Sequence, residues 1–159
     1  MSQKNLSNWL KATILIVGLC GLALYCVIVP SFGVSVAAAN PEFDYCFVPW
    51  LVFISVTALP CYAALVLIWL MAMDIGRDRS FTTVNAKRLK WCAVLAAVDA
   101  AYFFIGNVVL LLANCSHPGI TLMSMLVVFV AAAASVVFAA LSHLVRKAAA
   151  LQEQSDLTI

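Results

Sequence analysis

Charged side chains are scarce in this sequence of 159 residues. Asp, Glu, Lys and Arg together make up 10% of it, against about a quarter of an ordinary soluble domain. Hydrophobic residues make up 65%, and a soluble fold of this size could not bury so much apolar surface. The composition therefore excludes an ordinary soluble domain and predicts that lipid is the solvent for much of the chain.

Motifs for catalysis and for cofactor binding are also missing. No Cys-x-x-Cys pair occurs, which argues against a thiol oxidoreductase of the quinone-linked four-helix kind. No cluster of His, Cys and acidic residues has metal-ligand spacing, and no Gly-rich phosphate loop or nucleophile motif is present. The sequence therefore predicts no catalytic residue, no cofactor, no metal site and no direct contact with nucleic acid.

Long hydrophobic runs dominate what is present. A helix needs about 20 mostly apolar residues to cross a bilayer, and its backbone groups must bond within the segment. Four runs meet this length, and short connections between them predict an all-α, up-down-up-down membrane bundle formed by one domain over residues 1–159. The predicted spans are residues 10–30, 48–73, 91–113 and 120–145.

Positive charge lies at alternate ends of these spans. All nine Lys and Arg residues fall in the N-terminal segment, in the loop 74–90 or in the tail 146–159, whereas the connections 31–47 and 114–119 contain none. The positive-inside rule therefore predicts that both termini and the middle loop are cytoplasmic. The nine residues are Lys4, Lys11, Arg77, Arg79, Lys87, Arg88, Lys90, Arg146 and Lys147.

The first hydrophobic run has a second interpretation. Two lysines, an apolar run and the small residues at 36–40 could form a cleaved signal peptide. The apolar run is longer than a usual signal core, and its removal would leave three spans and reverse the charge distribution. We therefore expect the run to be retained as a span.

The middle loop contains signals for a helix end and a helix start. Gly76 is predicted to end the second helix in a left-handed conformation, and Thr82 to cap a helix that runs from Thr83 without a break into the third span. The basic residues could contact anionic lipid, or they could bind a cytoplasmic partner, and both interpretations stay open. These residues are Arg77, Arg79, Lys87, Arg88 and Lys90, together with Arg146 and Lys147, where the fourth helix is expected to continue to Gln154.

One acidic residue, Asp99, lies within a span. A charged carboxylate in lipid costs several kcal/mol of free energy, so we expect Asp99 to face the interior of the bundle. The same face of the third helix also carries Tyr102, Phe103, Gly106 and Asn107. Gly106 would allow a close approach of helices, and Asn107 a hydrogen bond across the interface. Three roles for Asp99 stay open, which are a structural acid bonded to a Ser, Thr or Tyr hydroxyl, a ligand-binding or proton-coupling group, and a partner of His143.

Two of the six cysteines lie at predicted outer ends of spans. Cys46 precedes the second span and Cys115 follows the third. Antiparallel neighbouring helices would bring these ends together, in a compartment that permits disulfides. The positions predict a Cys46–Cys115 disulfide, with two unpaired thiols as the alternative.

Two segments resemble a known family. The run Phe81-Thr82-x-x-Asn85-x-Lys87-Arg88-Leu89 and the ending 141–159 are similar to those of bacterial four-helix membrane proteins catalogued as domain of unknown function 2975. Members more often carry Glu where Val84 stands. The resemblance supplies no activity and no catalytic residue. Its genes commonly lie beside one for a small helix-turn-helix regulator, which implies a membrane partner of a transcription factor in the bacterial inner membrane.

Two functions are compatible with these features. The first is a membrane-anchored regulatory or sensory module, in which the middle loop and the tail bind a cytoplasmic helix-turn-helix regulator. The second is a small transporter that works as a homo-oligomer, with Asp99 as the substrate or proton-coupling site. Four-helix exporters of the small multidrug type carry an acid in their first helix, and the first span here has none. We do not expect an enzyme.

Overall fold

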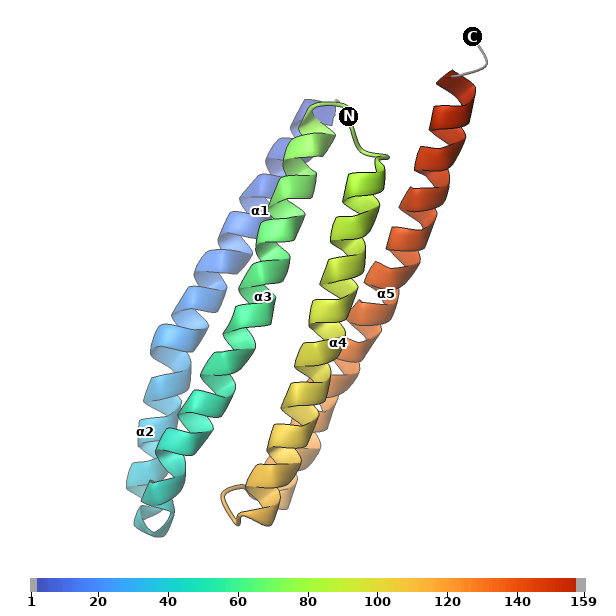
Figure 1. Ribbon diagram of the computed structural model, residues 1–159. Coiled ribbons are helices and arrows are strands. Elements are labelled where there is room, and N and C mark those ends of the chain that lie inside the picture. The colour runs from blue at the N-terminus through green and yellow to red at the C-terminus, as the bar shows by residue number, and fades with distance from the viewer. Residues whose placement is uncertain (1–2, 157–159) are drawn as a thin grey trace.

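The helices account for nearly all of the chain. The computed structural model describes residues 3–156 and contains no strand among them. Four helical rods are long and apolar enough to cross a membrane (Figure 1). The elements are α1 (Gln3–Ala23), a π-helical turn η1 (Leu24–Ile28), α2 (Val29–Ala39), a 3₁₀ turn η2 (Pro41–Cys46), α3 (Phe47–Gly76), α4 (Thr83–Leu112) and α5 (Pro118–Asp156).

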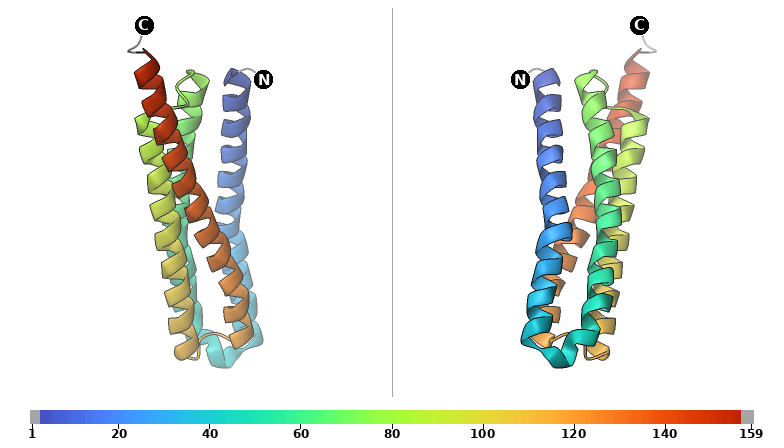
Figure 2. Two further views of the ribbon diagram at one scale, coloured as in Figure 1. Left: turned by 90° about the vertical axis from the view of Figure 1, so that its right-hand side faces the viewer. Right: turned by 90° about the vertical axis from the view of Figure 1, so that its left-hand side faces the viewer.

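The rods run up and down in chain order, as predicted. The N-terminus, the α3–α4 connection and the end of α5 lie together at one end, which we call the basic end (Figure 1). Helix α1 packs on α3, α3 on α4, and α4 on α5 (Figure 2). Among residues 3–156, no Cα atom of α1 lies within 8 Å of one in α4 or α5. The bundle is therefore open between its first and last rods.

The first rod is longer than predicted. The connection expected over 31–47 is wrong, because α1, η1 and α2 continue as one rod to Ala39. Pro30 has no N–H to donate within a helix, and its ring clashes with the preceding turn. The widened turn η1 precedes it, and in that turn the Val29 N–H bonds the Leu24 carbonyl. The helix thus continues through a proline by local widening.

Hydrogen bonds hold the first rod, formed by α1, η1 and α2, against α3 at three levels. The Ser7 hydroxyl donates to the Ala72 carbonyl at 2.6 Å. Near the middle, the Tyr62 hydroxyl donates to the Gly18 carbonyl at 2.8 Å. The third contact joins the hydroxyls of Tyr25 and Thr57 at 2.8 Å. Such bonds, with close packing, fix helix pairs where lipid removes the hydrophobic drive for association.

Small side chains bring α4 and α5 together. Ala86, Ala93 and Ala100 are buried at seven-residue intervals on α4, a spacing that keeps one face toward a partner helix. From α5, the Ser135 hydroxyl donates to the Ala93 carbonyl at 2.8 Å, and that of Ser142 to the Ala86 carbonyl at 2.7 Å. Two such bonds seven residues apart on both helices define a regular antiparallel register.

Aromatic side chains form the α3–α4 interface. The Phe53 ring packs against those of Tyr102 and Phe103, at centroid distances of 5.3 and 5.5 Å. The Tyr102 hydroxyl donates to the Phe53 carbonyl at 3.3 Å. Gly106 lies beneath the same ring, which leaves no room for a Cβ atom at that position. The expected bond of Asn107 across an interface is wrong, since its amide donates to the Phe103 carbonyl of its own helix.

Aromatic residues also lie at the two predicted membrane surfaces. Trp9 is 69% exposed near the basic end of the first rod, and Phe32 lies exposed near the other end. They are 23 positions apart in one continuous rod, which is about 35 Å at 1.5 Å per residue. This separation suits a hydrocarbon core about 30 Å thick. The Phe32 ring packs against Trp50 of α3 at a centroid distance of 6.4 Å.

Gly106 provides a test of the α3–α4 packing. A Cβ atom there would lie 2.0 Å from Phe53 Cε2, so Gly106→Ala should lower the free energy of unfolding by about 1–3 kcal/mol through overpacking. At Gly18 an added Cβ would meet no atom within 4 Å, so Gly18→Ala should not destabilise the protein. Denaturant titration in detergent measures both. Equal losses of stability in the two variants would contradict this account of the interface.

Candidate functional site

The turn after α3 is held by several hydrogen bonds. Helix α3 includes Gly76, and the residue in the left-handed region is Asp78, with φ of 59°. The prediction that Gly76 takes this conformation is wrong. Gly76 instead makes room for Ser7 of α1, whose hydroxyl oxygen would lie 2.7 Å from an added Cβ. The Arg79 N–H then bonds the Asp74 carbonyl at 2.9 Å and closes the turn.

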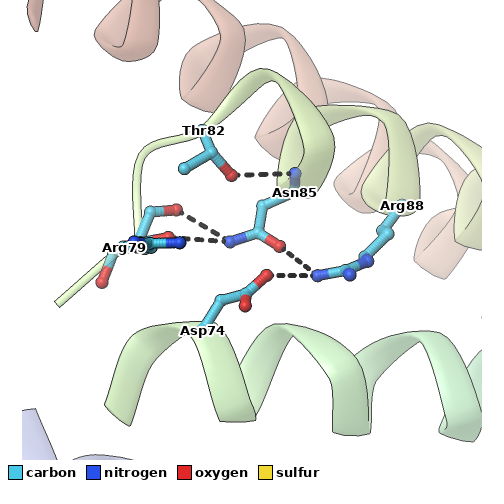
Figure 3. A network of polar contacts seen from close by, with 6 residues as sticks. Asp74, Arg79, Thr82, Asn85 and Arg88 are labelled. Atoms are coloured by element: carbon cyan, nitrogen blue, oxygen red, sulfur yellow. Dashed lines mark hydrogen bonds and ion pairs between the residues drawn. The ribbon is translucent and has the colours of Figure 1, made fainter. Parts of the chain in front are cut away.

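Asn85 holds this turn from the first turn of α4 (Figure 3). Its amide nitrogen donates to the carbonyls of Arg79 and Ser80, at 3.1 and 3.3 Å. Its backbone N–H bonds the Thr82 hydroxyl at 3.2 Å, which confirms the predicted cap and the helix start at Thr83. Asn85 is only 3% exposed. Thr82 and Asn85 of the sequence motif therefore fix the conformation of the loop through these hydrogen bonds.

Arg88 differs from the other basic residues of this segment. Its guanidinium donates to the side-chain oxygen Oδ1 of Asn85 at 2.8 Å and forms an ion pair with Asp74 of α3 (Figure 3). Among the described side chains of residues 3–155 this is the only ion pair. Arg88 thus joins α3 to α4 and is only partly available to a partner. The exposed cations of the segment are Arg77, Arg79, Lys87 and Lys90.

The tail continues α5 beyond the other helices, as predicted for residues up to Gln154 (Figure 1). The α4–α5 register places the start of α4 level with Val145, so the exposed Arg146 and Lys147 come after it. Ala149 is 2% exposed, so another part of the chain still covers it, whereas Leu151 is 63% exposed. Residues 157–159 of the predicted tail lie outside the described residues.

A polar cluster within the membrane surrounds Asp99. The Cys61 thiol of α3 donates to Asp99 Oδ2 at 3.8 Å, and the Asp99 Oδ1 atom is buried without a hydrogen-bond partner. Tyr25 approaches from η1, where its hydroxyl meets that of Thr57 and lies near the Cys61 thiol. The cluster thus lies on the side of the α3–α4 pair from which the first rod approaches. Three rods contribute to it.

The predicted partners of Asp99 are mostly elsewhere. The hydroxyl partner expected for a structural acid is replaced by the Cys61 thiol. The pairing with His143 is wrong, because His143 lies beside Arg146, at 3.4 Å between their nitrogens. The α4–α5 register places His143 level with the first turns of α4, about 20 Å from the level of Asp99. Tyr102 shares the α3-facing side of α4 with Asp99 and bonds Phe53.

Two members of the cluster were not predicted. Tyr25 and Cys61 were assigned no role in binding, since each is a single polar residue in an apolar run. A signal was present in the sequence, because each lies close to a proline within a span, Tyr25 before Pro30 and Cys61 after Pro60. Prolines loosen the backbone bonding of a helix, and π-helical turns are frequent at functional sites.

The opposite end of the bundle is tied covalently. Cys46, the last residue of η2, forms a disulfide with Cys115 of the α4–α5 connection, with 5.4 Å between their Cα atoms. The structure thus joins the two cysteines that were predicted to pair. Cys20, Cys26, Cys61 and Cys92 are free. Within residues 3–156 no three His, Cys, Asp or Glu side chains form a group that could hold a metal ion.

Comparison with known proteins places the chain among membrane proteins. The model of the family described as Protein of unknown function (DUF2975) matches residues 31–159. A similar curated protein is the Uncharacterized membrane protein YoaS of Bacillus subtilis (strain 168), which is 28% identical over 158 residues. The alignment covers 95% of this chain and 96% of that protein. No solved structure matches the chain.

The role of Asn85 can be tested by proteolysis. Asn85→Ala leaves the two loop carbonyls and part of the Arg88 guanidinium unpaired, at a cost of about 1–3 kcal/mol. Trypsin should then cut purified protein faster at Arg77 and Arg79, as read on reducing gels. Val84→Ala changes the neighbouring exposed side chain and is the matched control. Equal cutting rates for both variants would show that Asn85 does not hold the turn.

Proposed function

We propose that this chain, which belongs to the family described as Protein of unknown function (DUF2975), is a membrane-anchored regulatory or sensory module. Its basic end faces the cytoplasm, in accord with the positive-inside rule, and binds a small helix-turn-helix regulator of the kind that the family resemblance implies. The observation that carries the proposal is that the basic end has a defined structure. A hydrogen-bonded turn and a protruding helix present exposed side chains on a fixed frame.

The order of the α3–α4 turn favours a docking role. A loop that only sets orientation requires positive charge and no particular shape. Here one buried side chain, Asn85, bonds two loop carbonyls and the Arg88 guanidinium. A preformed turn loses little conformational entropy when a partner binds, so more of the contact energy appears as affinity. The turn is thus suited to specific recognition.

Charge indicates which face of a regulator would dock here. Four exposed cations surround the turn, so a complementary partner presents an acidic face. A helix-turn-helix protein contacts DNA through cationic side chains. Its docking face would therefore differ from its DNA-binding face. The membrane protein would control where the regulator is located and leave its DNA contacts uncovered.

The end of α5 favours a protein partner over a lipid surface. Residues 146–156 continue the helix beyond the start of α4, by about 16 Å at 1.5 Å per residue. Leu151 projects from this part and is 63% exposed. An exposed apolar side chain that leads away from the bilayer is an anchor that a protein surface can bury.

The Asp99 cluster is the sensing element of this proposal. Helix α3 carries both Cys61 and Asp74, and α4 carries both Asp99 and Arg88. A ligand that separates Asp99 from Cys61 would shift α4 against α3, and two continuous helices connect this point to the Asp74–Arg88 ion pair. The turn and the cluster thus share one interface that both sites can bias. The proposal assigns no chemical reaction to the protein.

A second candidate function, a small transporter acting as a homo-oligomer, is favoured by one observation. The Asp99 Oδ1 atom is buried without a partner, so it is available to a proton or to a cationic substrate. The cluster lies toward the first rod, and within residues 3–156 no Cα atom of that rod lies within 8 Å of one in α5. A second copy could close that open side and complete a polar path.

Crosslinking from native membranes tests the regulatory proposal. Lys87→Gln with Lys90→Gln should abolish recovery of a small DNA-binding protein, because two exposed cations of the docking face are removed while Arg88 is kept. Replacement of both lysines by Arg preserves charge and orientation and should preserve recovery. Mass spectrometry identifies the partner. Recovery of the protein alone from wild-type membranes, at normal expression and topology, would refute the regulatory role.

Cation binding in proteoliposomes tests the transporter. Wild-type protein should bind the lipophilic cation tetraphenylphosphonium and exchange it against protons. Asp99→Asn should reduce both the binding and the exchange rate at least tenfold, because a neutral amide does not attract the cation as a carboxylate does. Tyr102→Phe removes a nearby hydroxyl that bonds Phe53 and is the matched control. Wild-type flux equal to that of empty vesicles, or an unaffected Asn variant, would exclude this function for Asp99.

A further inference from the structure

A cavity of about 280 Å³ lies between α1 and α3 at the basic end. From α1 it is lined by Lys4, Ser7, Asn8 and Lys11, and on the other side by the end of α3, which includes Gly76, and by Arg77 just after it. It shares Arg77 with the turn that Asn85 holds, and it is separate from the Asp99 cluster. Neither proposed function uses it.

Helical geometry accounts for the lining of the cavity. Lys4, Ser7, Asn8 and Lys11 follow the spacing that places residues on one face of a helix. The Ser7 hydroxyl bonds the Ala72 carbonyl and fits against Gly76, which has no side chain to obstruct it. This contact fixes α1 against α3 at the depth of the cavity. The position of the cations thus follows from rigid elements.

The charge within the cavity is all of one sign. Lys4, Lys11 and Arg77 line it, and no acidic residue does. Over the side chains described for residues 3–155 the single ion pair is that of Arg88 with Asp74, so these three cations have no ion-pair partner there. Cations held around one small space repel one another. An anion bound between them would remove this cost and gain three attractive contacts.

The cavity lies at the depth of the lipid head groups. Trp9, which belongs to the same helical turns, is 69% exposed, and exposed tryptophans of membrane proteins gather at the interface with water. Basic pockets between helices at that level bind the head groups of anionic lipids. The volume is below that of pockets for drug-sized ligands, and Lys and Arg are the side chains that bind phosphate oxygens.

We propose that this cavity binds one phosphate group, presented by an anionic phospholipid or by a small soluble phosphate compound. Lys4 and Lys11 supply point charges, and the Arg77 guanidinium supplies paired donors. The proposal does not depend on the regulatory role, because Lys4 and Lys11 lie outside the docking turn and only Arg77 belongs to both sites. A lipid head group bound here would also bridge α1 and α3, so binding should raise the thermal stability of the protein.

Titration of delipidated protein in detergent, read by native mass spectrometry, tests the site. The probes are phosphatidylglycerol, phosphatidylcholine and glycerol 3-phosphate. Lys11→Gln with Arg77→Gln should weaken phosphatidylglycerol binding by about fivefold for each cation removed. Lys87→Gln with Lys90→Gln removes the same charge at the same end but outside the cavity, and should leave binding unchanged. Lys11→Arg with Arg77→Lys keeps the charge and should retain binding, which shows that the cavity variants fold.

The outcomes separate the source of the phosphate from the existence of the site. Tight phosphatidylglycerol binding with weak glycerol 3-phosphate binding supports a lipid head group. Equal affinity for glycerol 3-phosphate, lost in the same variants, supports the site with a soluble source. Equal weakening by the Lys87 and Lys90 changes, or equal affinity of the wild type for phosphatidylglycerol and phosphatidylcholine, overturns the proposal, because general surface charge or the acyl chains would then explain binding.

Discussion

Helices in lipid gain nothing from the hydrophobic effect when they associate with one another, since lipid tails are as apolar as their side chains. The structure meets this constraint with hydroxyl groups that donate to carbonyls of the next helix. Ser7 and Tyr62 do this between α1 and α3, and Ser135 and Ser142 between α4 and α5. Each bond is worth about 0.6 kcal/mol in membrane proteins. Several such bonds, combined with small residues that allow close approach, fix the helix positions on which the sites depend.

The sequence predicted features that depend on composition and local pattern, and failed where a neighbour decides the conformation. The four spans, the start of α4 at Thr83 and the grouping of basic residues at one end follow from hydropathy, capping and chain order. The extension to Ala39 requires the widened turn before Pro30, which hydropathy does not reveal. Gly76 was assigned to a turn because glycine favours one, whereas Ser7, 69 residues away, is the reason for a small residue there. The partners of Asp99 lie on other helices, so no local pattern identifies them.

The two candidate sites occupy different depths of one interface. At the basic end, Asp74 and Arg88 pair across α3 and α4, and deeper in the membrane Cys61 and Asp99 meet across the same two helices. Between Asp99 and the far end, the Phe53 ring packs tightly against α4. The interface is thus aromatic on the disulfide side of Asp99 and has two polar contacts from Asp99 to the basic end. The Cys61–Asp99 contact and the Asp74–Arg88 ion pair therefore lie on the same side of the Phe53 packing.

The disulfide between Cys46 and Cys115 has a consequence for the covalent structure of the chain. Residues 46–115, which include α3, the basic turn and α4, form a closed ring, and the first rod and α5 are two arms that leave this ring near a single point. A protease that cuts the basic turn in an oxidising membrane preparation opens the ring but does not divide the molecule. Both halves stay linked through sulfur, and only a reductant releases them as separate fragments.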